Sequence, residues 1–312
     1  MNKNKDRYGW LEGVIAPLVT PITKEEKLDI NGLEKLVSNQ LKNKVNVLFI
    51  LGSVGEGPRL TSKVRKQVVK ETIRICADKI PVIAGVMDNS VSLVLEKIKE
   101  LEDFGIYAGV VTLPYYGWQK NISAEINFFL TLADKSPVPI VAYNLPYAVG
   151  SEIDFKVIER LFKHPNIAGI KNSGSNPDAM KRIIKAPNRP EQFKFLLGNS
   201  AYAKEMLFAG ADGLVATVSN LFPELILDIY DSAKLKKIER VKFLQKSILE
   251  LNKVGRYPSS AGGIKCALNI LGICNKYTVR PWPEANRQDE IKIRQILNKV
   301  KKMYSKLSER AE

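Results

Sequence analysis

Residues 138–173 read VPIVAYNLPYAVGSEIDFKVIERLFKHPNIAGIKNS, and they contain two short apolar runs joined by a longer segment. The runs at 138–146 and 166–173 are rich in Val, Ile, Leu and Ala. Such runs are typical of strands that are buried on both faces of a parallel sheet. Asp154 is a good helix-capping residue between them, so the stretch predicts one strand–helix–strand unit.

The same alternation occupies most of the chain. Segments with helical spacing, such as INGLEKLVSNQLKN at 30–43, separate the apolar runs. Eight such alternations predict a (β/α)8 TIM barrel. A doubly wound open sheet also alternates, but no GxGxxG follows the first run and no GxxxxGK[ST] occurs, which favours the barrel. The six further runs are at 13–20, 45–53, 81–87, 108–114, 193–200 and 212–220.

The pattern changes after residue 221. From there the chain has helical spacing to its end, with breaks near 255–263 and 277–285. A barrel needs only one more helix at that point. We therefore expect residues 1–221 to form the barrel and residues 222–312 to add its last helix and a C-terminal helical extension, all within one structural unit.

Composition places the chain among ordinary globular proteins, because 45% of its 312 residues are hydrophobic and 26% are charged. No apolar run reaches the roughly 18 residues of a membrane span. The N-terminal MNKNKDRYGW lacks the apolar core of a signal peptide. Cys76, Cys266 and Cys274 are widely spaced, as is typical of reduced thiols. These features predict a cytoplasmic protein that does not span a membrane.

The net charge of +15 permits binding to nucleic acid. Most basic residues, however, alternate with acidic residues on helical segments, and neither zinc-finger spacing nor an arginine-rich arm is present. The pattern therefore argues against a nucleic-acid partner and favours a solvated lysine-rich surface. A positive field of this kind also attracts small anions.

Two strand ends carry residues that could support catalysis. In such a barrel, catalytic groups follow the C-terminal ends of the strands, where Tyr143 and Lys171 lie in the fifth and sixth runs. A lysine in an apolar pocket has a lowered pKa, and its neutral amine can form a Schiff base with a ketone while a nearby phenol moves protons. Position alone leaves two alternatives open, since Lys171 could also extend to solvent and Tyr143 could simply pack at the barrel mouth.

The sequence predicts no metal site. His164 is the only histidine and precedes Pro165 in a loop. Glu56 and Asp88 are the acidic residues nearest to the strand ends, and they form no carboxylate cluster. A serine nucleophile also lacks a partner base, because the single histidine lies on the wrong segment.

Four motifs at the strand ends resemble the dihydrodipicolinate synthase / N-acetylneuraminate lyase family of class I aldolases. They are GSVGEG at 52–57, LPYYG at 113–117, YNLP at 143–146 and GIKNSG at 169–174. The resemblance covers nearly the full chain. It implies a barrel with C-terminal helices, and a lysine Schiff base that needs neither a metal nor an organic cofactor.

The resemblance also implies roles for individual residues. Lys171 would form the imine with pyruvate or another 2-keto acid, Tyr143 would be the acid/base, and Ser53 would relay protons. Tyr116 matches a family tyrosine that reaches across a dimer contact into the neighbouring site. The resemblance thus implies a homo-oligomer, either a dimer or a tetramer.

Three further positions match residues that bind the substrate in this family. The amides of Ser53 and Val54 would hold the carboxylate of the keto acid, and the backbones of Gly198 and Val215 would face the substrate. Val54 replaces a second hydroxyl residue found in many members. Ala148 stands where dihydrodipicolinate synthases carry an arginine that grips the second substrate, which argues against that reaction.

The segments GEGP, YNLPYAVG and VATVSNLFPE resemble 2-keto-3-deoxy sugar acid aldolases. The resemblance therefore implies reversible cleavage of a sugar acid such as 2-keto-3-deoxygluconate to pyruvate and an aldehyde. Alternatives are 4-hydroxy-tetrahydrodipicolinate synthase, N-acetylneuraminate lyase, a keto-deoxy-sugar-acid dehydratase, and a barrel that binds a keto acid or nucleic acid without turnover. Arg59, Trp118 and Ser219 are candidates for recognising the aldehyde.

Overall fold

The structure, a computed structural model, describes residues 7–308. Eight parallel strands close into a barrel in sequence order, and β8 pairs with β1. This confirms the predicted (β/α)8 barrel. The strands are β1 Gly13–Pro17, β2 Val47–Ile50, β3 Val82–Gly85, β4 Ala108–Thr112, β5 Ile140–Asn144, β6 Ile167–Asn172, β7 Lys194–Leu197 and β8 Gly213–Val215.

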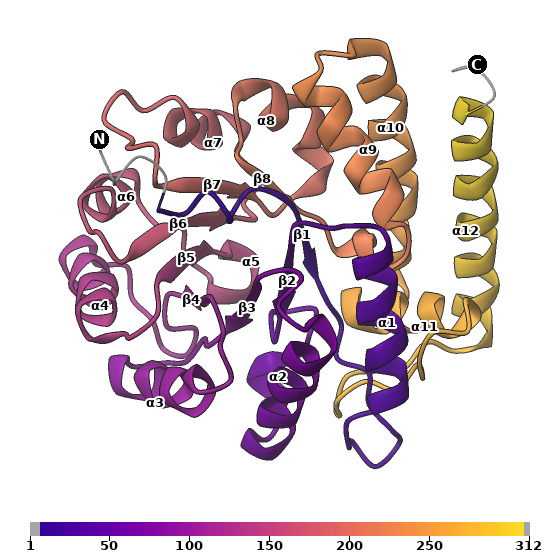
Figure 1. The fold of residues 1–312 in the computed structure, drawn as a ribbon, viewed down its shortest axis with the longest axis horizontal. Helices are drawn as coiled ribbons and strands as arrows, with labels where there is room; N and C mark the ends of the chain where they lie inside the picture. The colour runs from indigo at the N-terminus through magenta and orange to yellow at the C-terminus, as the bar shows by residue number, and fades with distance from the viewer. Residues whose placement is uncertain (1–6, 309–312) are drawn as a thin grey trace.

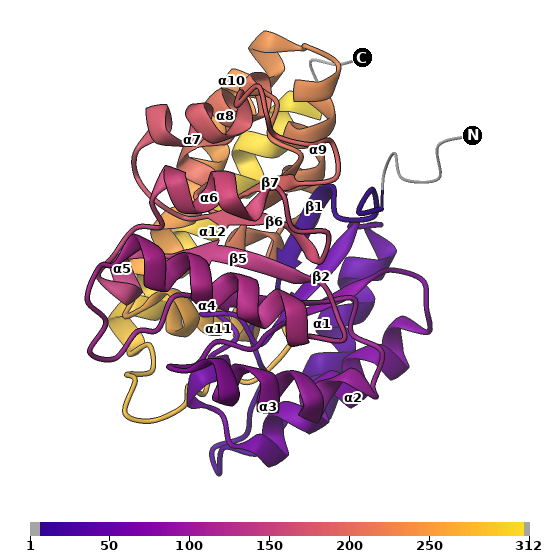
Figure 2. The same ribbon diagram turned by 90° about the vertical axis from the view of Figure 1, so that its left-hand side faces the viewer.

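Helices surround the barrel, and α2 Ser62–Cys76 and α3 Val91–Glu102 lie on the opposite side of it from α7 Pro177–Ile184 and α8 Ala203–Ala209 (Figures 1 and 2). The helix α1 Ile30–Lys42, for example, packs the apolar stripe of Leu33, Leu36 and Val37 on the outside of the sheet. The helices up to the end of the barrel are α1 Ile30–Lys42, α2 Ser62–Cys76, α3 Val91–Glu102, α4 Ile122–Lys135, α5 Pro146–Val149, α6 Phe155–Leu161, α7 Pro177–Ile184, α8 Ala203–Ala209 and α9 Pro223–Lys234.

The C-terminal extension forms a layer outside the barrel. It comprises α10 Ile238–Leu251, α11 Ser260–Ile270 and α12 Arg287–Ser308, with α10 packed on α9 and α12, and α11 packed on α12 (Figure 1). Short 3-10 turns, η1 Gly57–Arg59, η2 Ser200–Tyr202, η3 Thr217–Asn220 and η4 Asn252–Arg256, lie beside the strand ends and the start of α11.

Two apolar layers result from the alternation of side chains along each strand. The inner layer fills the barrel and includes Ile15, Phe49, Val141 and Leu196. The outer layer joins the strands to the helices. Because both faces of each strand are buried, the strand sequences are continuous apolar runs rather than alternating ones.

A buried ion pair ties the C-terminal extension to the loop after β2. Lys265 of α11 donates to the Glu56 carboxylate, and both side chains are fully buried. The other carboxylate oxygen of Glu56 accepts the N–H of Val279 at 2.9 Å. Removal of one partner would leave an uncompensated buried charge, so this contact couples the extension to the mouth of the barrel.

No helix among residues 7–308 is long and apolar enough to cross a membrane. The expectation about a signal peptide depends on residues 1–10, of which residues 1–6 lie outside the described part of the chain.

Candidate active site

The strand register brings the two residues predicted for catalysis side by side. Tyr143 of β5 and Lys171 of β6 are paired positions in the sheet. The Lys171 Nζ atom lies 4.1 Å from the centroid of the Tyr143 ring and 4.6 Å from that of the Phe49 ring. Lys171 is 6% exposed, and its burial lowers the pKa of the ammonium to about 7. A substantial fraction of this amine is therefore neutral near pH 7.

Hydroxyl groups surround the Tyr143 phenol. The Ser173 hydroxyl donates to the phenolic oxygen at 3.4 Å. Burial raises the pKa of Tyr143, and hydrogen bonds with Ser173, Ser53 and Tyr147 oppose this effect. A protonated phenol in contact with several hydroxyls can pass protons along a chain.

The loop after β2 presents two unused backbone donors. Ser53 and Val54 line the cavity, and their N–H groups donate no hydrogen bond to any residue in the described part of the chain. Leu51 and Glu56, on either side, both have positive φ angles of 57°. Such strained backbone persists where surrounding contacts hold it, and here the buried contact to Lys265 holds Glu56. Two successive backbone N–H groups without a protein acceptor suit a carboxylate.

Gly198 and Val215 line the same cavity. A Cβ atom at Gly198 would lie 2.1 Å from the Ser173 Oγ atom and 3.1 Å from the Lys171 Cε atom. Any other residue at this position would therefore displace the lysine or the serine.

The cavity at this end of the barrel has a volume of about 720 Å³, which suits a small organic substrate. The strands and the C-terminal extension both line it, and its wall includes no Asp, Glu or His among the described residues. Besides the residues already named, the lining includes Arg59, Ala148, Asn199, Ser200, Thr217, Asn252, Ser259, Ser260 and Trp282.

Tyr116 does not join the other predicted site residues within one chain. Its side chain is 85% exposed, and it is not part of the cavity lining. The Tyr116 N–H donates to the Asn89 side-chain oxygen at 2.9 Å, which fixes the backbone of this loop. The predicted role in a neighbouring site therefore remains a prediction about an assembly.

Sequence reasoning missed several residues of the cavity. Ser173 follows Lys171 by two positions and therefore continues the same face of the strand, so the period-two pattern could have identified it. Asn252, Ser259 and Trp282 come from the C-terminal extension, for which the sequence carries no comparable signal. Among the candidates for aldehyde recognition, Arg59 lines the cavity, whereas Trp118 and Ser219 do not.

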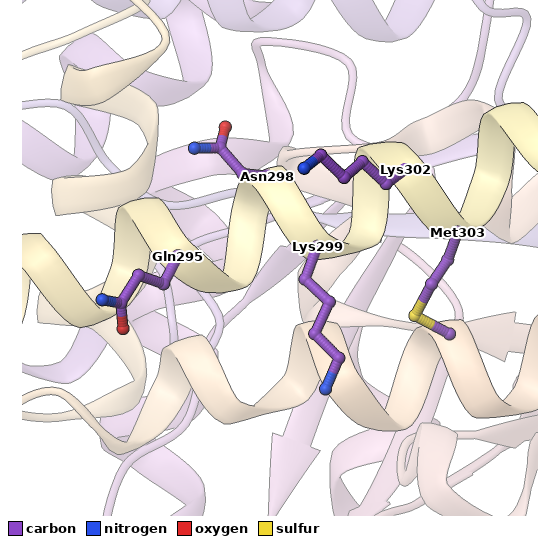
Figure 3. Close-up of a pocket in the computed structure, with 5 residues that line it drawn as sticks. All are labelled: Gln295, Asn298, Lys299, Lys302 and Met303. Atoms are coloured by element: carbon purple, nitrogen blue, oxygen red, sulfur yellow. The ribbon is translucent and has the colours of Figure 1, made fainter.

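A second hollow lies along the helix α12, which carries all the residues that line it (Figure 3). Its lining consists of Gln295, Asn298, Lys299, Lys302 and Met303. Lys299 pairs with Glu250 of α10 at 3.0 Å, so part of this lining serves to attach α12. No group of three or more His, Cys, Asp or Glu side chains that could hold a metal ion occurs in residues 7–308.

The pKa of Lys171 predicts how the reaction of its amine depends on pH. Imines form from the neutral amine, so if Lys171 is the Schiff-base lysine that the motifs imply, its pKa of about 7 should make the rate of imine formation rise about tenfold from pH 6 to pH 8 and then level off. Rapid mixing with pyruvate, followed by quenching with borohydride, measures this rate. A rate that still rises tenfold per pH unit above pH 8 would contradict the lowered pKa.

Comparison with known proteins agrees with this geometry. The model of the Dihydrodipicolinate synthetase family matches residues 10–300. A 4-hydroxy-tetrahydrodipicolinate synthase from Methanospirillum hungatei JF-1 is 28% identical over 92% of this chain and 99% of its own length.

Two solved structures are also similar. A monomeric dihydrodipicolinate synthase variant superposes with a TM-score of 0.90 at 26% identity, covering 96% of this chain and 99% of that chain. The chloride-inhibited dihydrodipicolinate synthase from Acinetobacter baumannii, complexed with pyruvate, has a TM-score of 0.88 at 28% identity, covering 93% and 98%.

The fold and the match along nearly the whole chain define a (β/α)8 carbon–carbon lyase, that is, an aldolase of the Schiff-base type. The chain belongs to the Dihydrodipicolinate synthetase family. The resemblance found in its four motifs is thereby confirmed.

Proposed function

We propose that Lys171 is the Schiff-base lysine of this aldolase and that pyruvate is the keto acid it binds. The observation that carries the proposal is a buried amine with a pKa of about 7 on the wall of an open cavity, in contact with the Tyr143 ring. The similar Acinetobacter baumannii enzyme was solved in complex with pyruvate, which supports the choice of keto acid.

The proposed reaction starts when the neutral Lys171 amine attacks the ketone carbon of pyruvate. Water leaves, and a protonated imine forms. Tyr143 gives its proton to the departing hydroxyl and becomes a phenolate. The imine withdraws electrons, so the methyl carbon passes a proton to this phenolate, which restores the Tyr143 phenol, and the imine becomes an enamine. The enamine carbon then bonds to the carbonyl carbon of an aldehyde, the resulting alkoxide takes a proton from Tyr143, and water releases the product from the lysine. The reverse sequence is aldol cleavage.

The surrounding residues are assigned supporting roles. Ser53 and Ser173 relay protons to and from the Tyr143 phenol, with which they share hydrogen bonds. The free N–H groups of Ser53 and Val54 bind the pyruvate carboxylate, so a hydroxyl at Val54 is not required. Gly198 leaves room for the imine beside Lys171, and Val215 lines the same cavity. Tyr116 is proposed to act at a contact between two copies of the chain.

The names of the relatives favour 4-hydroxy-tetrahydrodipicolinate synthase over a sugar acid aldolase. Dipicolinate denotes a pyridine dicarboxylate, which has seven carbons and a ring nitrogen. Pyruvate supplies three carbons and one carboxylate, so the aldehyde must supply four carbons, an amine and the second carboxylate. This description fits aspartate 4-semialdehyde. We propose this condensation as the first candidate reaction.

Ala148 supports cleavage of a 2-keto-3-deoxy sugar acid as a second candidate. It lines the cavity on α5 and carries no polar atom beyond its backbone. The side chains of Asn199, Ser200 and Asn252 offer amide and hydroxyl groups that suit the hydroxyls of a sugar chain.

A panel of substrates separates the two candidates. We expect turnover of pyruvate with aspartate 4-semialdehyde, measured by loss of pyruvate, to exceed turnover with D-glyceraldehyde by at least about tenfold in kcat/KM. The release of pyruvate from 2-keto-3-deoxygluconate tests the reverse direction. A preference for glyceraldehyde and the sugar acid would reverse the ranking, and no consumption or release of pyruvate with any substrate would refute the aldolase reaction.

A further inference from the structure

The cavity wall carries two cationic side chains and, among the described residues, no acidic one. One of these cations is Lys171, whose amine is consumed when the imine forms. The other is Arg59, on the turn η1 directly after the loop that carries Ser53 and Val54. The charge of the protonated imine lies on the bound keto acid itself, so Arg59 is the cationic side chain of the wall that stays available to a second substrate.

Glu56, the acid nearest to Arg59, is already bound elsewhere. Its carboxylate accepts hydrogen bonds from Lys265 and from the N–H of Val279, and its side chain is fully buried. The Arg59 Nη1 atom lies 3.6 Å from Glu56, which is longer than a hydrogen bond. The single carboxylate of Glu56 thus faces two cations, Lys265 and Arg59, so the three side chains together keep one net positive charge.

The Arg59 guanidinium also has free donors. Its side chain is 33% exposed, and it donates no hydrogen bond to any side chain or carbonyl within residues 7–308. Burial lowers the pKa of Arg59, but a guanidinium remains charged throughout the physiological range. Its donors can thus face a ligand in the cavity.

Trp282 holds the guanidinium in place. The Arg59 Cζ atom lies 4.2 Å from the centroid of the Trp282 ring, a cation–π arrangement. The backbone of Trp282 is fixed in turn, because its N–H donates to Val279 at 3.1 Å and its carbonyl accepts from Thr278 at 2.8 Å. A guanidinium stacked on a ring presents its remaining donors as a planar fork, the geometry that matches a carboxylate.

We propose that Arg59 is the residue that selects the second substrate, by binding a carboxylate at the end remote from the reacting carbonyl. This inference rests on the proposed function and narrows it to aldehydes that bear a carboxylate. Two anion sites then lie in one cavity, with the free amides of Ser53 and Val54 for the keto acid and Arg59 for its partner. Ala148 supplies no cation to the cavity, whereas Arg59 supplies one from another part of its wall.

Binding of two keto acids of equal length tests the proposal without any need for turnover. 2-Oxoadipate ends in a carboxylate, whereas 2-oxohexanoate ends in a methyl group at the same position. Calorimetry should show 2-oxoadipate bound at least about tenfold more tightly by the wild-type protein, as expected for charge-assisted hydrogen bonds. In Arg59→Gln this preference should fall to within about twofold. Arg59→Lys should keep part of it, since the charge remains but the fork is lost.

Arg256→Gln provides a matched control, because Arg256 is exposed on the neighbouring turn η4 and does not line the cavity. It removes the same charge and should leave the preference intact. The proposal is overturned if the wild-type protein shows no preference for 2-oxoadipate, or if Arg59→Gln retains it. Arg59→Gln should unfold at a temperature close to that of the wild type, which separates lost binding from lost structure.

Treatment of the same samples with borohydride keeps the two hypotheses distinct. If both keto acids are trapped on Lys171 without any preference, the role of Arg59 is wrong and the aldolase proposal stands. If the preference depends on Arg59 but neither acid is trapped on Lys171, the imine is wrong and the anion site stands.

Discussion

Lys171→Met should lower turnover of pyruvate with an aldehyde by at least about 10³-fold, because the variant cannot form the imine on which every later step depends. Methionine fills a similar volume without a charge, so it suits the apolar contact with Phe49 and Tyr143. Steady-state kinetics over the panel of aldehydes measures the loss.

The stability of Lys171→Met distinguishes a chemical role from a structural one. The pKa of Lys171 is lowered to about 7 in the folded protein, so between pH 7 and the ordinary lysine pKa the unfolded chain binds more protons. The lysine therefore costs folding free energy at pH 7, and this cost falls as the pH rises towards the unfolded pKa. Its removal should raise the unfolding temperature at pH 7. A variant that is both inactive and less stable would indicate a structural role.

Lys163→Met is the matched control for this change. Lys163 is exposed just before β6, at the opposite end of the strand from Lys171. The variant Lys163→Met loses an amine far from the cavity, so its turnover of pyruvate should match that of the wild type. A loss at Lys163 comparable to that at Lys171 would contradict the assignment of the amine.

Tyr143→Phe should reduce kcat by about 10²- to 10³-fold while the imine with pyruvate still forms. The ring remains to pack beside Lys171, and only the phenolic hydroxyl is lost. That hydroxyl is the group that contacts Ser173 and Ser53 and would protonate the alkoxide. Kinetics combined with borohydride trapping separates the loss of proton transfer from the loss of imine formation.

Tyr202→Phe is the corresponding control. The Tyr202 hydroxyl donates to the Ser175 carbonyl at 2.9 Å, but the residue is not part of the cavity lining. Removal of the Tyr202 hydroxyl should change kcat by less than about threefold. An equally small effect in Tyr143→Phe would show that another group transfers the proton.

The barrel could be predicted because its strands are buried on both faces. Each of the eight apolar runs contains one observed strand, since continuous burial leaves a continuous apolar sequence. The sequence predicted the ends of the strands less accurately. The run at 212–220 forms a strand only to Val215, because Asn220 turns back to bind the Pro17 carbonyl and the Val19 N–H. This contact spans about two hundred positions and leaves no local signal.

The candidate site was predictable where it depends on strand ends. Lys171, Tyr143, Ser53, Val54, Gly198 and Val215 all line one cavity because the parallel strands end at the same edge of the barrel. The wall supplied by Asn252, Ser259 and Trp282 was not predictable, because it depends on how the C-terminal extension folds back over that edge. The stacking of Arg59 on Trp282 likewise joins residues that no periodic pattern connects.

The most direct test of the central claim is the covalent adduct itself. The protein is incubated with pyruvate and borohydride, digested, and analysed by mass spectrometry. The peptide containing Lys171 should gain about 72 Da, which corresponds to pyruvate minus water plus two hydrogens. An adduct on a different lysine, an adduct that persists in Lys171→Met, or no adduct at all would contradict the claim that Lys171 forms the Schiff base.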